Sequence, residues 1–314
     1  MSGRRQFLQG IGAGLLGLGL PGALQAVTKT PIADAGFFRH IPKTAETIPV
    51  IGLGTSRTFH VDINNKSAMQ QRMLVVKTLL EQGCSMIDSS PMYANAEEVI
   101  GLCLDQISQD LQEKVFSTSK VWSLRLQDGI RKYAESETLW REKQFDLMQV
   151  HNLLNLSKTL ALLQKYKAEE RVRYIGVTTS HRRRHKDMLE IMNTQDIDFV
   201  QFSYNIDNRL AEEKLFPAAQ KNRLAVIINR GFQTGYLFER VADKDLPDWA
   251  NEIGVQSWAQ FFLKFIISHP AVTVVIPATR NPAHMLENIH AARGPLPDNK
   301  MRHEMIRYFD SVAR

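Results

Sequence analysis

Cysteine is nearly absent from this sequence, since Cys84 and Cys103 are the only two in 314 residues. Two cysteines in a chain of this length define no disulfide framework, and we expect both to be buried free thiols. Zinc-knuckle spacing and the aromatic motifs of RNA-binding domains are lacking too. His181 and His185 lie four residues apart, but they flank an arginine run that repels cations, so we expect no metal site.

Membrane-spanning runs are also lacking, because the apolar stretch 10–20 is too short and too rich in glycine for a good spanning helix. Arg4 and Arg5 precede this stretch, and Ala23 and Ala26 follow it. This order is typical of a twin-arginine export signal with a cleavage region. We therefore predict a signal peptide over residues 1–26, twin-arginine export machinery as a partner, and a periplasmic location. The alternatives are a disordered basic tail or an uncleaved anchor, and a cytoplasmic protein.

A strong charge of one sign is absent as well, because the formal net charge is only +6 over the whole chain. Such an excess does not by itself indicate a nucleic-acid partner, and we expect none. The hydrophobic and charged fractions, 44% and 23%, are those of a globular enzyme. No linker or low-complexity segment divides the chain. We expect an N-terminal extension or hairpin over residues 27–47, a single domain over 48–314, and a monomer.

What the sequence does contain is a regular alternation of short apolar runs and helical patterns. Such alternation predicts a parallel sheet, and eight units suit a closed (β/α)8 TIM barrel better than an open sheet. A further helix is expected over 298–314. The predicted strands are 48–55, 85–88, 115–120, 146–151, 174–177, 199–202, 224–229 and 272–277, and the helices that follow them are 67–82, 97–104, 129–143, 158–167, 186–192, 211–221, 256–268 and 282–292.

Four polar residues stand at or just past the ends of three consecutive predicted strands: Asp88, Tyr93, Lys120 and His151. In a barrel these strand ends converge on one mouth. A phenol holds its proton at neutral pH, and a nearby ammonium, itself paired with a carboxylate, lowers the phenol's pKa. A histidine can orient a carbonyl oxygen. Together these groups can polarise a carbonyl and protonate it as a hydride arrives.

Each of these residues also has an ordinary structural interpretation. An aspartate at a strand end is often a helix cap, a loop tyrosine or lysine is usually part of the surface, and a lone histidine is most often structural. Four such residues at corresponding places in successive repeats are much less common by chance. The pattern therefore favours a catalytic site over four unrelated structural residues.

The sequence resembles the aldo/keto reductase superfamily from about residue 48 to residue 292. The matching segments, in the family's order, are Ile51-Gly52-Leu53-Gly54-Thr55, the 87–101 stretch with Asp88, Tyr93, Glu97 and Gly101, Ser119-Lys120, Gln149-Val150-His151, 171–177, Val200-Gln201 with Tyr204-Asn205, and Val275-Ile276-Pro277 with Glu287-Asn288. The resemblance implies a barrel that uses NADP, or NAD, to reduce aldehydes and ketones. Tyr93 then matches the general acid, Lys120 and Asp88 the pair that tunes it, and His151 the residue that orients the carbonyl.

The resemblance also implies cofactor-binding positions. Thr178 and Thr179 stand where the family often has Ser-Asn for the nicotinamide amide, and Gln201 matches the other amide contact. A stacking tyrosine after the seventh strand is not evident, and Phe232 is our substitute. The remaining predicted contacts are Arg280 and His284 for the 2′-phosphate of NADP, and Glu287 and Asn288 for adenine.

Two aromatic residues, Phe59 and Trp122, are candidates for the substrate pocket, with packing at the barrel rim as an equal alternative. The sequence thus predicts a carbonyl reductase acting on a small molecule. The alternative is a nucleotide-binding or partner-binding barrel with little turnover. A lyase or hydrolase would need paired carboxylates or metal ligands at the strand ends, and neither is found.

Overall fold

The computed structural model describes residues 37–313. The predicted export signal over residues 1–26 lies outside the described residues, as do residues 27–36 of the extension predicted over 27–47. Among the residues that are described, no helix is long and apolar enough to cross a membrane.

Eight strands form one sheet in which neighbours in sequence are neighbours in space, and all their pairings are parallel. The first and last strands meet: the backbone NH of Gly52 donates to the carbonyl of Val275 over 2.9 Å, and Ile51 bridges Val275 in parallel. The predicted (β/α)8 barrel is therefore confirmed. The strands are β3 (Leu53–Gly54), β4 (Met86–Asp88), β5 (Phe116–Val121), β6 (Phe145–His151), β7 (Val172–Thr178), β8 (Phe199–Ser203), β9 (Ala225–Asn229) and β10 (Val274–Val275).

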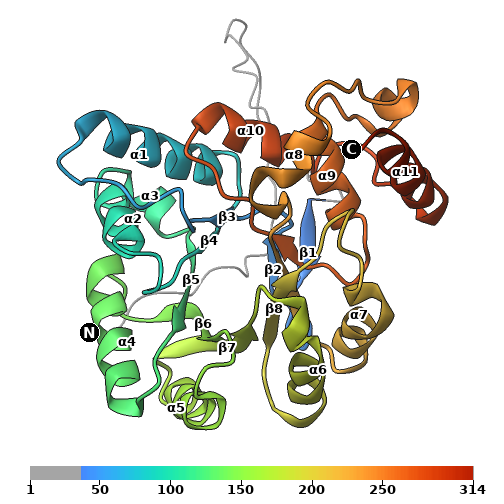
Figure 1. Ribbon diagram of the computed structural model, residues 1–314. Helices are drawn as coiled ribbons and strands as arrows, with labels where there is room; N and C mark the ends of the chain where they lie inside the picture. Colours follow the sequence, from blue (N-terminus) through green and yellow to red (C-terminus); the bar gives the residue numbers. More distant parts are fainter. Residues whose placement is uncertain (1–36, 314) are drawn as a thin grey trace, which may run out of the picture. The chain divides into compact units, whose positions relative to one another are not determined.

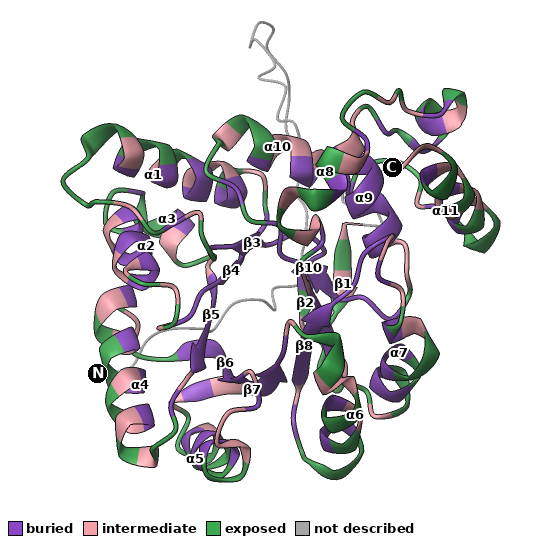
Figure 2. Cartoon of the chain, in the orientation of Figure 1, coloured by how far each residue is buried: buried purple, intermediate pink, exposed green. Residues whose placement is uncertain are grey.

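Helices surround the barrel, and one of them follows each strand (Figure 1). The outward faces of most of these helices are exposed, while most strand residues and the inward helix faces are buried (Figure 2). The exception is α9 (Trp258–Ile267), in which every residue after Trp258 is buried. This arrangement places the main hydrophobic core between sheet and helices. The eight are α1 (Lys66–Glu81), α2 (Ala96–Leu104), α4 (Leu126–Trp140), α5 (Leu156–Ala168), α6 (His185–Thr194), α7 (Ala211–Lys221), α9 (Trp258–Ile267) and α10 (Pro282–His290).

The helix predicted over 129–143 begins earlier and ends earlier in the structure, as α4. It stops at Trp140 because Arg141 has a left-handed backbone conformation, with φ of 57°. The C-terminal helix, α11 (Asn299–Val312), packs outside the ring and lies within the helix predicted over 298–314 (Figure 1). Elements that the sequence pattern did not predict are α3 (Gln109–Gln112), α8 (Tyr236–Arg240) and the short 3₁₀ segments η1 (Arg182–Arg184), η2 (Gln233–Gly235) and η3 (Asp248–Ile253).

An antiparallel hairpin of β1 (Phe38–His40) and β2 (Thr47–Pro49) precedes the barrel. Ile41 and Ile48 of this hairpin are buried in a second apolar cluster. The other members of that cluster are barrel residues, several of which lie at the beginnings of strands, such as Met86. The hairpin therefore covers the amino-terminal end of the barrel, and the opposite end is free to hold polar side chains.

Candidate active site

The polar groups at the carboxyl end of the barrel follow from strand register. Side chains alternate between the two faces of a strand, so residues two or four apart share a face. Met86 and Phe116 belong to the apolar cluster inside the barrel. Asp88 follows Met86 by two residues, and Lys120 follows Phe116 by four, so both carboxylate and ammonium enter the barrel above an apolar layer.

Lys120 and Asp88 form a buried ion pair. The Nζ atom of Lys120 lies 2.6 Å from Oδ2 of Asp88, and it also donates to the backbone carbonyl of Ser89 over 2.6 Å. The other carboxylate oxygen of Asp88 accepts from the amides of Gln201, at 3.2 Å, and Gln149, at 3.4 Å. Each charge is thus both paired and hydrogen-bonded, as a buried charge requires.

The charge state of Lys120 is set by its neighbours. Burial alone would lower the pKa of its ammonium, but the Asp88 carboxylate and the Tyr93 phenol outweigh burial, and the pKa is raised. Lys120 therefore stays protonated at neutral pH.

Tyr93 lies beside this pair and remains partly exposed. The Nζ atom of Lys120 is 5.3 Å from the centroid of the phenol ring. Burial raises the pKa of Tyr93, and Lys120 opposes that shift without overcoming it. The direction differs from the sequence-based expectation that Lys120 would lower this pKa, because sequence gives no measure of how far the phenol is desolvated.

His151 completes the group of four. Its ring meets that of Tyr93 edge-on, with centroids 5.8 Å apart and planes at 89°. Burial, and then the charge of Lys120, lowers the pKa of His151 to about 3, so the imidazole is neutral at physiological pH. Its Nδ1 atom lies 2.7 Å from the hydroxyl oxygen of Ser90. The four residues singled out from the sequence therefore lie together at one end of the barrel.

Glu97 of α2 is hydrogen-bonded to β5, the strand that carries Lys120. Its buried carboxylate accepts hydrogen bonds from Ser119, Ser136 and Trp140, at 2.5, 3.0 and 3.1 Å. Burial raises the pKa of Glu97, and the three hydrogen bonds oppose it. Because Ser119 precedes Lys120 on β5, this carboxylate fixes the strand end that carries the lysine.

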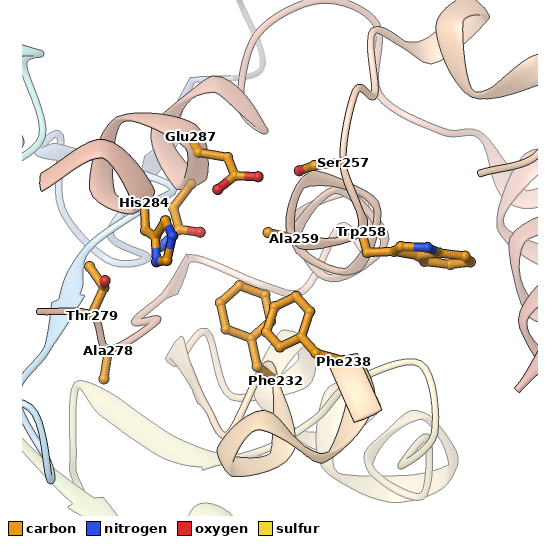
Figure 3. A pocket seen from close by; sticks show the side chains of 10 residues that line it. Phe232, Phe238, Ser257, Trp258, Ala259, Ala278, Thr279, His284 and Glu287 are labelled. Atoms are coloured by element: carbon orange, nitrogen blue, oxygen red, sulfur yellow. The ribbon is translucent and has the colours of Figure 1, made fainter. Parts of the chain in front are cut away.

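A pocket of about 400 Å³ lies between η2, α8, α9 and α10 (Figure 3). Phe232 and Phe238 stand side by side, with ring centroids 4.9 Å apart. His284 and Glu287 lie across the pocket from them. Four of the predicted cofactor residues, Phe232, His284, Glu287 and Asn288, line this pocket, and the other lining residues are Phe238, Ser257, Trp258, Ala259, Ala278 and Thr279.

Three further predicted cofactor residues lie inside the barrel mouth and are already hydrogen-bonded. The hydroxyl of Thr178 donates to Oε1 of Gln201, whose Nε2 donates to Asp88. The hydroxyl of Thr179 accepts from the backbone NH of His181 over 3.2 Å, and its carbonyl accepts from the amide of Asn229. Gln201 therefore orients Asp88, and the sequence did not predict this contact.

Arg280 is exposed and is not among the residues that line the pocket. Arg280 stands just before α10. Burial lowers the pKa of Arg72 on α1, and the positive charge of Arg280 lowers it further. The guanidinium of Arg72 donates to the carbonyl of Thr58 over 2.6 Å. The guanidinium of Arg280 and the N-terminus of α10 that follows it both favour an anion.

The two predicted substrate-pocket residues have different environments. Phe59 is fully buried in the main core, which favours the packing alternative for this residue. Trp122 is half-buried, and the ammonium of Lys132 lies 4.9 Å from its ring centroid.

Cys84 and Cys103 are both free and buried. Among residues 37–313, no three His, Cys, Asp or Glu side chains are grouped to hold a metal ion.

Sequence reasoning missed Ser90, Phe238 and Thr279. Ser90 lies inside the Asp88–Tyr93 loop, so its proximity to a catalytic candidate was a usable signal. Phe238 belongs to α8, an element that the sequence pattern did not predict, and only the fold brings it beside Phe232.

Comparisons with known proteins identify the family and the fold. The sequence model of the "Aldo/keto reductase family" matches residues 50–304. The curated protein "Aldo-keto reductase YhdN" of Bacillus subtilis (strain 168) is 25% identical over 215 residues, which are 60% of this chain and 61% of that protein. The chain thus matches somewhat less than two thirds of this relative's length.

Two solved structures from Klebsiella pneumoniae have the same fold, each with a TM-score of 0.71 over 84% of this chain and 92% of the other. One is an aldo/keto reductase in complex with NADP and acetate, at 22% identity, and the second is an aldo-keto reductase in complex with NADPH, at 24%. At these identities the likeness establishes the barrel architecture.

Proposed function

This chain belongs to the aldo/keto reductase family, and from that premise we propose that it is an NADP(H)-dependent oxidoreductase that reduces aldehyde or ketone carbonyls to alcohols. The observation that carries the proposal is the group of four at the barrel mouth. The centroid of the Tyr93 ring lies 5.3 Å from the Lys120 ammonium and 5.8 Å from the centroid of the His151 ring, and Asp88 holds that ammonium. NAD remains the alternative cofactor.

In this proposal His151 and Tyr93 bind the carbonyl oxygen. The neutral imidazole donates a hydrogen bond that orients the substrate, and the phenol donates its proton as negative charge develops on the oxygen. Burial keeps the phenol protonated until that moment, because it raises the pKa of Tyr93. The Lys120 ammonium then stabilises the phenolate that remains, and Asp88 keeps the ammonium in place.

The pocket beside the mouth fits the nucleotide part of the cofactor. Two phenyl rings form an apolar wall for a flat base, and Glu287, Asn288 and Thr279 supply polar groups for its edge. Arg280, exposed just before α10, supplies positive charge suited to a 2′-phosphate. When bound, the reduced cofactor supplies the hydride. The inference that it is NADP also draws on the two Klebsiella pneumoniae structures, which are complexes with NADP and NADPH.

The proposal is tested by following NADPH oxidation with a panel of small aliphatic and aromatic aldehydes and ketones. We expect turnover with some of them, and loss of turnover by about 10²-fold or more in Tyr93→Phe. Tyr236→Phe, which removes an exposed phenol on α8, is the matched control and should retain activity. Normal turnover by Tyr93→Phe would rule out this assignment of the acid. Tight NADPH binding with no turnover on the whole panel would favour the binding-barrel alternative.

We also propose that the chain is exported by the twin-arginine route with its cofactor already bound. Support comes from the order of Arg4, Arg5 and the apolar stretch 10–20. Replacing both arginines by lysine should retain the protein in the cytoplasm, as measured by cell fractionation and immunoblotting. An unchanged distribution between fractions would contradict export by this route.

A further inference from the structure

We propose that Ser90 is a positioning residue: its hydroxyl donates to Nδ1 of His151 and thereby holds the imidazole proton on Nε2, the nitrogen that can donate to a carbonyl oxygen. The catalytic meaning of this tautomer rests on the proposed function. The tautomer itself rests only on the contacts around the two side chains.

The contact between the two residues is short and shielded from water. The Ser90 hydroxyl oxygen lies 2.7 Å from Nδ1 of His151. Ser90 has no exposed surface and His151 is 6% exposed. Ser90 belongs to the loop after β4, and His151 ends β6, so this hydrogen bond joins residues from two different repeats. In such surroundings a hydrogen bond, once lost, is not replaced by one to bulk water.

The direction of the bond follows from what else surrounds the hydroxyl. The backbone NH of Met92 donates to the Ser90 oxygen over 3.2 Å, so one lone pair of that oxygen is already used. A hydroxyl has a single proton to donate. Within residues 37–313, Nδ1 of His151 is the acceptor that the structure places within reach of it. If Nδ1 carried the imidazole proton instead, the buried hydroxyl proton would have no acceptor, and an unsatisfied buried donor is unfavourable.

The imidazole has only one proton to place. The positive charge of Lys120 and the burial of the ring both oppose a second proton, and Tyr93, the nearest ring, is neutral. An acceptor role for Nδ1 therefore requires a proton on Nε2. This is the form that the proposed mechanism needs, because only a nitrogen that carries a proton can donate to a carbonyl oxygen.

Ser90 also positions Tyr93. The backbone carbonyl of Ser90 accepts from the NH of Tyr93 over 2.9 Å, which closes the turn that carries the phenol. One residue thus holds the imidazole through its side chain and the phenol through its backbone. The side-chain part of this function can be removed by mutation while the backbone part stays.

The tautomer can be read directly by two-bond ¹H–¹⁵N correlation spectra of the full chain labelled at histidine nitrogens. His151→Gln identifies the signals of His151 among those of the nine histidines. We expect wild type at pH 7 to carry the proton on Nε2, and Ser90→Thr, which keeps the hydroxyl, to do the same. A wild-type spectrum with the proton on Nδ1 would overturn the inference even if the protein turns out to reduce no carbonyl.

Kinetics of the same variants test the catalytic consequence. Ser90→Ala should lower kcat by about 10-fold or more with a smaller change in KM, and Ser90→Thr should restore most of it. Ser117→Ala is the matched control, because Ser117 is a buried β5 serine whose hydroxyl pairs with Asp146 near the other end of the barrel. Equal kcat in Ser90→Ala and wild type, or equal losses in Ser90→Ala and Ser117→Ala, would overturn the positioning role.

The pH profile separates positioning from packing. A donor on Nδ1 stabilises the neutral imidazole, so its removal raises the pKa of His151. Activity of Ser90→Ala should therefore fall in acid at a higher pH than activity of wild type. Coincident acid limbs in the two profiles would contradict the inference, since a serine that only packs would leave the titration of His151 unchanged.

Discussion

The ammonium of Lys120 and the carboxylate of Asp88 lie 2.6 Å apart with side chains that are 0% and 3% exposed. Removing two charges from water costs several kcal/mol for each, and their attraction repays this only if their other hydrogen-bonding positions are also used. Here the amides of Gln201 and Gln149 donate to the second carboxylate oxygen of Asp88, and the ammonium of Lys120 donates to the carbonyl of Ser89. The attraction between the two charges can therefore offset the cost of burying them, and the pair holds the ammonium 5.3 Å from the centroid of the Tyr93 ring.

Removing one partner of this pair should be costly. Lys120→Met leaves the Asp88 carboxylate buried without a counter-charge, and we expect a loss of about 3–5 kcal/mol in the free energy of unfolding. Replacing both residues, as in Lys120→Met with Asp88→Leu, should cost less than Lys120→Met alone, because no charge then stays buried. Urea unfolding of the three proteins measures this. A double variant less stable than Lys120→Met would contradict the account.

Acid should destabilise the protein partly through His151. Its pKa is lowered to about 3 in the folded state from an ordinary value of 6.5, so the unfolded chain binds the proton more readily. The stability that this neutral residue contributes is present above pH 6.5 and is lost as the pH falls from 6.5 toward 3. Thermal unfolding between pH 4 and 7 should therefore show a shallower fall in Tm for His151→Gln than for wild type. His269, whose pKa is also lowered, stays in both proteins and cancels in the comparison.

Arg280 should determine the preference for NADPH over NADH. A charge-assisted hydrogen bond to a phosphate contributes about 1.5–3 kcal/mol, so Arg280→Ala should weaken NADPH binding by about tenfold or more and leave NADH binding unchanged. Titration by intrinsic fluorescence measures both affinities. Arg131→Ala, on the exposed face of α4, is the control for general loss of positive charge. Equal weakening of both cofactors in Arg280→Ala would place the arginine away from the 2′-phosphate.

The phenyl rings of Phe232 and Phe238 should contribute equally to the binding of NADPH and of NADH. Stacking of a base on an aromatic ring contributes about 1–3 kcal/mol, so Phe238→Ala should weaken NADPH and NADH binding by a similar factor. Phe38→Ala, which removes another partly exposed phenyl ring on β1, should have no effect. Unchanged affinities in Phe238→Ala would show that the nucleotide does not occupy this pocket.

The barrel and its polar mouth could be predicted because both depend on short-range pattern. Strand and helix periodicities are local, and a chain that alternates them eight times has few other ways to bury its apolar faces. The positions of Asp88, Lys120 and His151 at strand ends follow from the same pattern. Helix ends were less accurate: the left-handed residue that terminates α4 is an arginine, a residue type that signals no stop.

The partners of each side chain were decided only by the tertiary structure. Nothing near Ser90 in sequence indicates that its hydroxyl meets His151, 61 residues away, or that Gln201 orients Asp88. The direction of the pKa shift of Tyr93 likewise depends on how much of the phenol is desolvated, and Phe59 is a core residue because of what packs around it. Sequence periodicity determines which face of an element a residue occupies, whereas burial and hydrogen-bond partners arise from contacts between elements that are distant along the chain.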